Sequence, residues 1–94
     1  MKRKTVLKIR KSLVSRWGLT AAQAKAIDKQ DPEWIKAMAI SVKLGALLNE
    51  DAHSERHWFT APRSRFRGWS AKEIIENRSA GLQLVAQMVE DETP

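Results

Sequence analysis

The stretch DPEWIKAMAISVKLGALL, residues 31–48, decides the fold of this chain. Asp31 is a good N-cap, Pro32 suits the first position of a helix, and Glu33 places negative charge at the positive end of the helix dipole. Apolar residues then cover nearly the whole circumference at about 3.6 residues per turn: Trp34, Ile35, Met38, Ile40, Val42, Leu44, Leu47 and Leu48. A helix that is apolar almost all round is a buried helix. We therefore predict a central core helix, with any function located on the elements that surround it.

Helical periodicity and capping residues divide the rest of the chain into short helices. Residues 5–16 carry a helical apolar stripe, and Gly18 is a natural stop signal behind it. Ser70 and Glu73 form the capping box of a helix over residues 71–77. Thr20 is predicted to cap a helix that ends near residue 28, and Ser54 to start a helix that Pro62 ends. Ser79 is predicted to cap the last helix, whose apolar face consists of Leu82, Val85, Met88 and Val89. We predict a single all-α domain over residues 1–94, a compact bundle of five to six short helices around one buried central helix.

The composition indicates a small protein of the cytoplasm. Ninety-four residues suffice for one domain with a modest core, and the absence of cysteine excludes disulfides and thiolate metal sites. The longest unbroken apolar run, residues 37–40, is far too short to span a bilayer, and no signal-peptide pattern follows the basic start. We expect a cytoplasmic protein that does not enter a membrane.

Positive charge is concentrated in the N-terminal half. Residues 1–50 hold eleven lysines and arginines against four acidic residues, whereas residues 51–94 hold six against seven. Seven basic residues precede Trp17 with no acid among them: Lys2, Arg3, Lys4, Lys8, Arg10, Lys11 and Arg16. Such an excess attracts phosphate backbones or an acidic protein face, although a solvated helix face explains it equally well. We keep these seven residues as candidate nucleic-acid contacts.

No pattern supports catalysis or metal binding. His53 and His57 are four residues apart, which suits zinc on a helix, but a helix that starts at Ser54 leaves His53 outside, and only Glu50 or Asp51 could add a further ligand. No nucleophile elbow surrounds any serine, and no glycine-rich phosphate loop is present. We predict no enzyme, no cofactor and no metal.

A helix-turn-helix outline is present, but its chemistry is weak. The segments 21–27 and 32–48 are joined by a short turn. A recognition helix exposes polar side chains near its N-terminus to reach base edges, whereas this one offers Glu33, Trp34 and Lys36. The pattern argues against sequence-specific DNA recognition by this helix, while non-specific phosphate contact by residues 5–16 stays open.

The segment between Pro62 and Ser70 carries the clearest signal for a protein partner. Three arginines alternate there with Phe66 and Trp69. Arginine and tryptophan are enriched where interfaces concentrate their binding energy, although one of the aromatics could simply pack on the core. The acidic tail after the last helix opposes the helix dipole, so it serves either solubility or a partner. We predict partner binding by Arg63, Arg65, Arg67, Trp69, Glu90, Asp91 and Glu92.

The C-terminal half also resembles a known family. The segments WFTAP at 58–62 and FRGWSA at 66–71, followed by Ile74, Ile75, Gly81 and Val85, look like the toxin-binding domain of the Xre/MbcA/ParS-like antitoxins. The family pattern is roughly W-L-x-x-P-N, a leucine, G-G, R, [ST]-P, an aliphatic pair and G-x-x-x-V, and the resemblance covers residues 42–92. Arg63, Arg67 and Ala71 depart from it, at positions where the family has asparagine, the first glycine and often proline.

The resemblance implies an antitoxin that neutralises a RES-domain, NAD-consuming toxin by covering its cleft with the C-terminal helices, and the acidic tail could then mimic pyrophosphate. Residues 1–48 would be a basic N-terminal region and residues 49–94 the toxin-binding region. The alternatives are a small basic DNA-binding regulator and a phage-type helical interaction protein with another target. Because four tryptophans and an apolar helix are a large apolar load for this length, we also expect a homodimer.

Trp58 and Pro62 are expected to be structural, with Trp58 mostly buried against the central helix and Pro62 ending its own helix. The substitution Trp58→Ala should lower the free energy of unfolding by roughly 3–5 kcal/mol, enough to unfold a marginal small domain. Thermal unfolding followed by circular dichroism measures this. A fully helical Trp58→Ala variant with an unchanged melting temperature would contradict the expectation.

Overall fold

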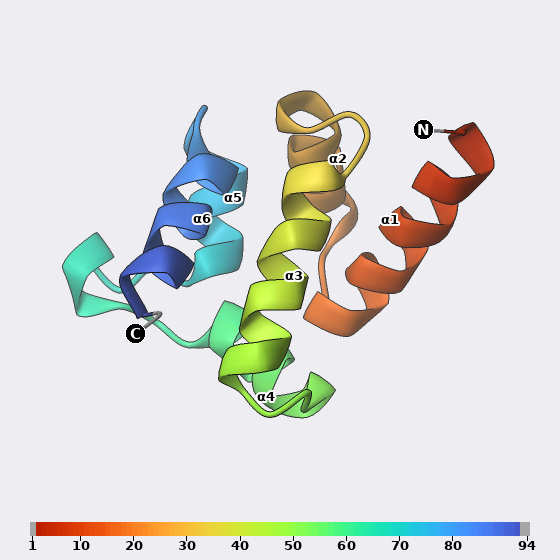
Figure 1. The fold of residues 1–94 in the computed structure, drawn as a ribbon. Coiled ribbons are helices and arrows are strands. Elements are labelled where there is room, and N and C mark those ends of the chain that lie inside the picture. Colours follow the sequence, from red (N-terminus) through yellow and green to blue (C-terminus); the bar gives the residue numbers. More distant parts are fainter. Residues whose placement is uncertain (1, 93–94) are drawn as a thin grey trace.

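The computed structural model describes residues 2–92, and these confirm the all-α prediction (Figure 1). Within them six α-helices and one 3-10 turn follow in the order α1 (Arg3–Trp17), α2 (Ala21–Gln30), α3 (Ile35–Leu47), α4 (Ala52–Thr60), η1 (Ser64–Phe66), α5 (Ala71–Asn77) and α6 (Gly81–Glu92). Figure 1 shows α3 at the centre, α1 to its right, α5 and α6 to its left, and α4 beneath. None of the described helices has the length and apolar character needed to cross a membrane.

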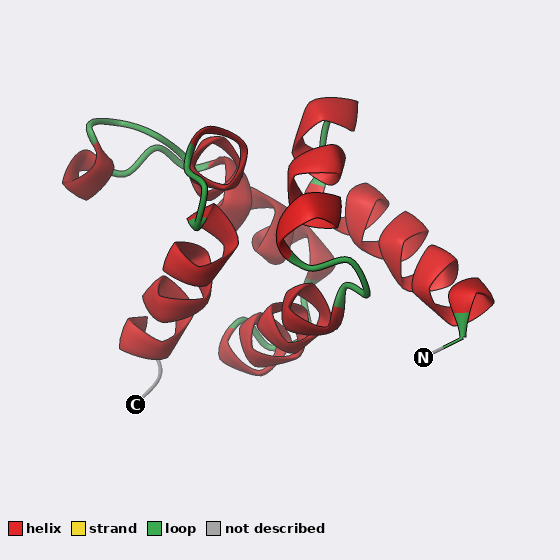
Figure 2. Ribbon diagram, turned by 90° about the horizontal axis from the view of Figure 1, so that it is seen from above, coloured by secondary structure: helices red, strands yellow, loops and turns green. Residues whose placement is uncertain are grey.

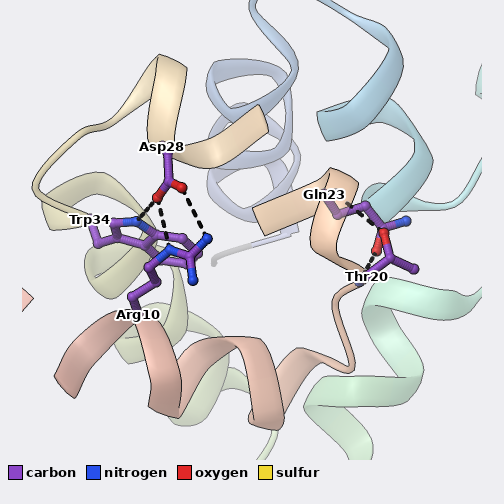
Figure 3. Close-up of polar contacts among 5 residues, drawn as sticks. All are labelled: Arg10, Thr20, Gln23, Asp28 and Trp34. Atoms are coloured by element: carbon purple, nitrogen blue, oxygen red, sulfur yellow. Dashed lines mark hydrogen bonds and ion pairs between the residues drawn. The ribbon is translucent and has the colours of Figure 1, made fainter. Parts of the chain in front are cut away.

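Several helix ends lie where local chemistry predicts them. Gly18 ends α1 in the left-handed conformation, with φ 65°. Thr20 and Gln23 form a reciprocal capping box at the start of α2, which Figure 3 shows. Ser70 and Glu73 form the second capping box, at α5, and the backbone N–H of Ser70 lowers the pKa of the Glu73 carboxyl. Side chains within three residues of a helix start therefore set these boundaries.

Three helix starts differ from the prediction. Helix α3 begins at Ile35 because Trp34 takes a left-handed conformation (φ 57°), although Asp31 still accepts a hydrogen bond from the Ala37 N–H at 2.9 Å. Helix α4 begins at Ala52 with Asp51 as its cap, so His53 lies inside the helix rather than before it. Helix α6 begins at Gly81, and the cap comes from α2: the side-chain oxygen of Gln30 accepts from the Leu82 N–H at 2.8 Å.

The carboxylate of Glu55 joins three helices in the core. Glu55 lies in α4 and its side chain is fully buried. It accepts hydrogen bonds from the Trp17 indole of α1 at 2.5 Å and from the Ser41 hydroxyl of α3 at 2.8 Å, and the Arg16 Nε lies 3.0 Å from its other oxygen. Phe59, one turn further along α4, stacks on Trp17 with ring centroids 4.1 Å apart. These contacts fix α1 on α4.

A second carboxylate ties α1 to α2 and to the turn before α3 (Figure 3). Both oxygens of Asp28 accept hydrogen bonds from the guanidinium of Arg10 at 3.0 Å, and the buried indole of Trp34 donates to Asp28 at 2.8 Å. The hydrogen bonds from Arg10 are the main cause of a lowered Asp28 pKa, and the bond from Trp34 adds to it.

Helix α3 corrects the prediction of a helix buried all round. Its inner face holds Ala37, Ile40, Leu44 and Gly45. On the opposite side Ile35, Met38 and Val42 are 50%, 37% and 68% exposed. The core is filled instead by large side chains from other elements, above all Trp17, Trp34 and Phe59. The exposures show that the described helices leave the outer face of α3 uncovered.

The position of Trp58 agrees with its predicted structural role. Its side chain is only 8% exposed, and it meets Phe59 edge-on with centroids 5.1 Å apart. Helix α4 ends at Thr60, two residues before Pro62. The Trp58 indole contacts α4, the loop that follows α4, and α6, as described below.

We expect Glu55→Gln to lower the free energy of unfolding by about 1.5–3 kcal/mol, because hydrogen bonds to a charged, buried acceptor are replaced by bonds to a neutral one and Arg16 loses its counter-charge. Urea titration followed by tryptophan fluorescence measures this. Glu76→Gln, on the exposed side of α5, is the matched control and should change stability little. Equal stabilities of the two variants would contradict the role assigned to Glu55.

Asp28 should contribute stability that depends on pH. Its folded pKa lies below the ordinary 3.8, so the contribution is complete above that value and is lost as the pH falls through the lower folded pKa. Because the side chain is 41% exposed, we expect only about 1 kcal/mol. Asp28→Asn should therefore be less stable than the parent at pH 7, and the difference should shrink in strong acid. A difference that stays constant down to the acid limit would refute this assignment.

Candidate partner-binding site

The predicted loop and the end of α6 lie together in space. Between Pro62 and Ser70 the chain forms a closed loop, in which the Arg63 N–H donates to the Trp69 carbonyl at 3.1 Å. Arg67 and Gly68 turn the chain with positive φ values of 57° and 86°. In Figures 1 and 2 this segment, with η1 at its tip, projects from the left side of the molecule.

The acidic residues at the end of α6 are paired within the chain. Glu92 lies 3.5 Å from the Arg63 guanidinium, and Asp91 lies 3.7 Å from that of Arg65. Glu90 forms an ion pair with Lys43 of α3. These acids therefore have a local role, and the interpretation that they have none is wrong. Within the predicted site, the acids at the end of α6 neutralise arginines of the loop. Residues 93 and 94 of the tail lie outside the described residues.

Arg63 is held in place by the core rather than presented to solvent. Its guanidinium lies 4.3 Å from the centre of the Trp58 ring and donates to the Trp58 carbonyl at 3.0 Å. The Trp58 indole in turn donates to Glu92 at 2.8 Å. Arg63, Trp58 and Glu92 thus form a clamp that joins α4, the loop and α6.

The same combination of an arginine, a carboxylate and a tryptophan occurs three times. In each case the indole donates to a carboxylate that is also paired with an arginine: Trp34, Asp28 and Arg10; Trp17, Glu55 and Arg16; Trp58, Glu92 and Arg63. The fourth tryptophan differs. The guanidinium of Arg78 lies 5.6 Å from the centre of the Trp69 ring, but among residues 2–92 no carboxylate is paired with either side chain. Trp69 and Arg78 therefore form an incomplete version of the triad.

Around this pair lies an open cavity of about 530 Å³, lined by Arg65, Phe66, Arg67, Trp69 and Arg78. We call it the arginine–aromatic pocket. Three guanidinium groups and two aromatic rings line it, with no acidic residue. Arg65 lies over Phe66 at 5.6 Å, and its side chain is 68% exposed. The sequence predicted three of the five residues, Arg65, Arg67 and Trp69, as partner-binding, but not Phe66 or Arg78. The place of Arg78 beside Trp69 results from the packing of the loop against the end of α5.

The seven basic residues of the N-terminal segment divide into two groups. Arg10 and Arg16 belong to the triads of Asp28 and Glu55 and are structural. The other five, Lys2, Arg3, Lys4, Lys8 and Lys11, are exposed. Only these five side chains of α1 and its N-cap are placed to meet a phosphate backbone.

The two histidines lie on the surface of α4. Both His53 and His57 are exposed. Within residues 2–92 no group of three or more His, Asp or Glu side chains is arranged to hold a metal ion.

Comparisons with known proteins identify no relative of this chain. No family model, no curated protein and no solved structure matches it. The family resemblance of the C-terminal half therefore remains a prediction.

Proposed function

We propose that this chain is an antitoxin-type protein that binds and neutralises a partner enzyme, and that its arginine–aromatic pocket receives an acidic side chain of that partner. The partner implied by the resemblance is a RES-domain, NAD-consuming toxin. The observation that carries the proposal is the incomplete triad, since Trp69 and Arg78 lack the carboxylate that accompanies the other three tryptophans.

The chemistry of the pocket favours a carboxylate. A guanidinium group binds a carboxylate with two parallel hydrogen bonds, and the partly exposed indole of Trp69 supplies both a donor and apolar area. Of the three cations that line the pocket, Arg65 is paired with Asp91, whereas no acidic residue of the lining accompanies Arg67 and Arg78, so an entering carboxylate offsets their charge. An aspartate or glutamate of the partner therefore fits the position that Asp28, Glu55 and Glu92 occupy in the complete triads.

The local backbone geometry also explains why the family pattern has glycine at particular positions. The left-handed conformations of Arg67 and Gly68 stand where the pattern has G-G, a pair that adopts such conformations without strain. At Gly81, an added Cβ would lie 2.2 Å from the Ile74 carbonyl oxygen, so only glycine lets α6 approach α5 this closely. These roles support the proposal, because Gly68 and Gly81 stand where the pattern has glycine and the backbone there favours it, although Arg67 takes the left-handed conformation without being glycine.

The paired acidic tail changes where we place the partner. Glu90, Asp91 and Glu92 are engaged with Lys43, Arg65 and Arg63, so a tail that enters the partner's cleft as a pyrophosphate mimic would first have to give up these contacts. The partner contact is therefore expected at the pocket, with Glu92 acting as a support for the loop.

A second candidate function, nucleic-acid binding, is favoured by the five exposed cations of α1 and its N-cap. Such contacts would be non-specific and strongly salt-dependent.

We also expect a homodimer, and light scattering at micromolar concentration can decide whether it forms.

The test compares two double variants that remove the same charge. We expect Arg67→Ala with Arg78→Ala to weaken binding to the RES-domain toxin encoded beside this chain by about 10- to 100-fold and to abolish rescue of growth on co-expression. Lys8→Ala with Lys11→Ala should leave both unchanged. The variant Arg78→Lys tests whether the geometry of the guanidinium group or only its charge is needed, because lysine keeps the positive charge but lacks the planar group that forms two parallel hydrogen bonds.

Full neutralisation by the pocket variant would overturn the proposed site, and a neighbouring gene without a RES-type product would overturn the proposed partner. For the second candidate, binding to a DNA duplex should fall with rising salt and should be weakened by the Lys8 and Lys11 substitutions but not by those in the pocket.

A further inference from the structure

The outer face of α3 carries a line of apolar side chains that the described structure leaves uncovered. Ile35, Met38 and Val42 are spaced by three and four residues and so follow one another along the helix. The exposed Ala39 and Ala46 lie beside them on the same face. The other large exposed apolar residues, Leu7 and Leu84, lie on α1 and α6, away from this line. Scattered exposed apolar residues are normal, whereas a contiguous apolar patch marks an interaction surface.

A groove runs between this line and α1. Its volume is about 310 Å³, and its lining residues are Ile9, Ser12, Leu13, Arg16, Met38, Ser41, Val42 and Glu50. Four of these side chains are apolar and come from both helices, namely Ile9, Leu13, Met38 and Val42. We call this surface, together with Ile35, the α1–α3 groove. Its residues are separate from those of the arginine–aromatic pocket.

The α1 side of the groove is basic. Helix α1, which forms one side, contains no acidic residue between Arg3 and Trp17 and exposes Lys8 above the groove-lining Ser12. Along the far edge of α3 lie Lys36, which is hydrogen-bonded to the neutral Gln83, and Lys43, which is paired with Glu90. Glu50 is the one acidic side chain among the lining residues.

We infer that the α1–α3 groove binds an amphipathic helix of a partner protein, with its apolar side on Ile35, Met38 and Val42 and acidic residues facing the lysines of α1. A helix laid into an apolar groove is a common mode of peptide recognition, with apolar anchors spaced by three and four residues. This inference goes beyond the proposed function and does not depend on it, because it uses different residues.

Charge argues against a second copy of this chain as the occupant. In an antiparallel two-fold pairing through α3, the α1 side of one copy faces the α1 side of the other. In a parallel pairing, α1 of each copy faces the lysine edge of its partner's α3. The lysines of α1 meet one another in the antiparallel arrangement, and they meet Lys36 and the Lys43–Glu90 ion pair in the parallel one; like charges across an interface are costly. Nucleic acid fits no better, because the exposed apolar side chains Ile35, Met38 and Val42 offer nothing to a phosphate backbone.

The test uses three synthetic helical peptides of about 18 residues, long enough to form a helix on binding. One has leucines along one face and glutamates on the flanks, the second replaces the leucines by alanines, and the third replaces the glutamates by lysines. Fluorescence anisotropy with the full chain measures binding. We expect binding of the first peptide only, because it alone combines the apolar face with negative charge.

The matched protein variants are Val42→Gln in the groove and Leu84→Gln on α6. Both positions are exposed, so both variants should fold. Val42→Gln should weaken binding of the first peptide by about tenfold, and Leu84→Gln should leave it unchanged.

Equal binding of the alanine peptide, equal binding of the lysine peptide, or unchanged binding by Val42→Gln would each overturn the inference. So would a chain that is dimeric in solution and becomes monomeric on Val42→Gln. None of these outcomes affects neutralisation through the arginine–aromatic pocket, so the two proposals fail independently.

Discussion

The structure depends on a carboxylate placed where no water reaches it. Glu55 in α4 is fully buried, yet it receives an indole N–H from Trp17, a hydroxyl from Ser41 and the charge of Arg16. A buried carboxylate is tolerated only when such partners surround it, so α1, α3 and α4 must meet in one arrangement to satisfy it. The position of α1 beside α3, and with it the groove between them, follows from this requirement.

The same chemistry recurs at the two ends of the molecule and explains how so small a chain uses four tryptophans. Asp28 holds Trp34 and Arg10 where α1 meets α2, and Glu92 holds Trp58 and Arg63 where α4 meets α6. Each triad buries an indole ring and satisfies its N–H with a carboxylate, while the arginine balances the charge. Trp69 with Arg78 has the ring and the cation only, and this contrast is the basis on which we propose a binding surface there.

Much of the candidate site could be predicted because its signal is local. Arg65, Arg67 and Trp69 stand close together in the sequence, and alternation of arginine with aromatic residues indicates a partner-binding loop without reference to the fold. Arg78 could not be predicted, because it reaches Trp69 only once α5 packs against the loop. The role of Glu90, Asp91 and Glu92 was misjudged for the same reason: the cations that pair with them come from α3 and from the loop.

By itself, the sequence determined the helical class and the helix boundaries set by short-range capping, such as Thr20 with Gln23 and Ser70 with Glu73. These depend on side chains that reach the backbone of the same helix end. Only the tertiary structure decided which apolar residues of α3 are buried. Periodicity shows which faces of a helix are apolar, but burial requires a neighbour, and the neighbours of α3 are fixed by contacts such as that between Trp17 and Glu55, 38 residues apart. Because those contacts bring the neighbouring helices against the face that holds Ala37, Ile40 and Leu44, the face with Ile35, Met38 and Val42 stays exposed.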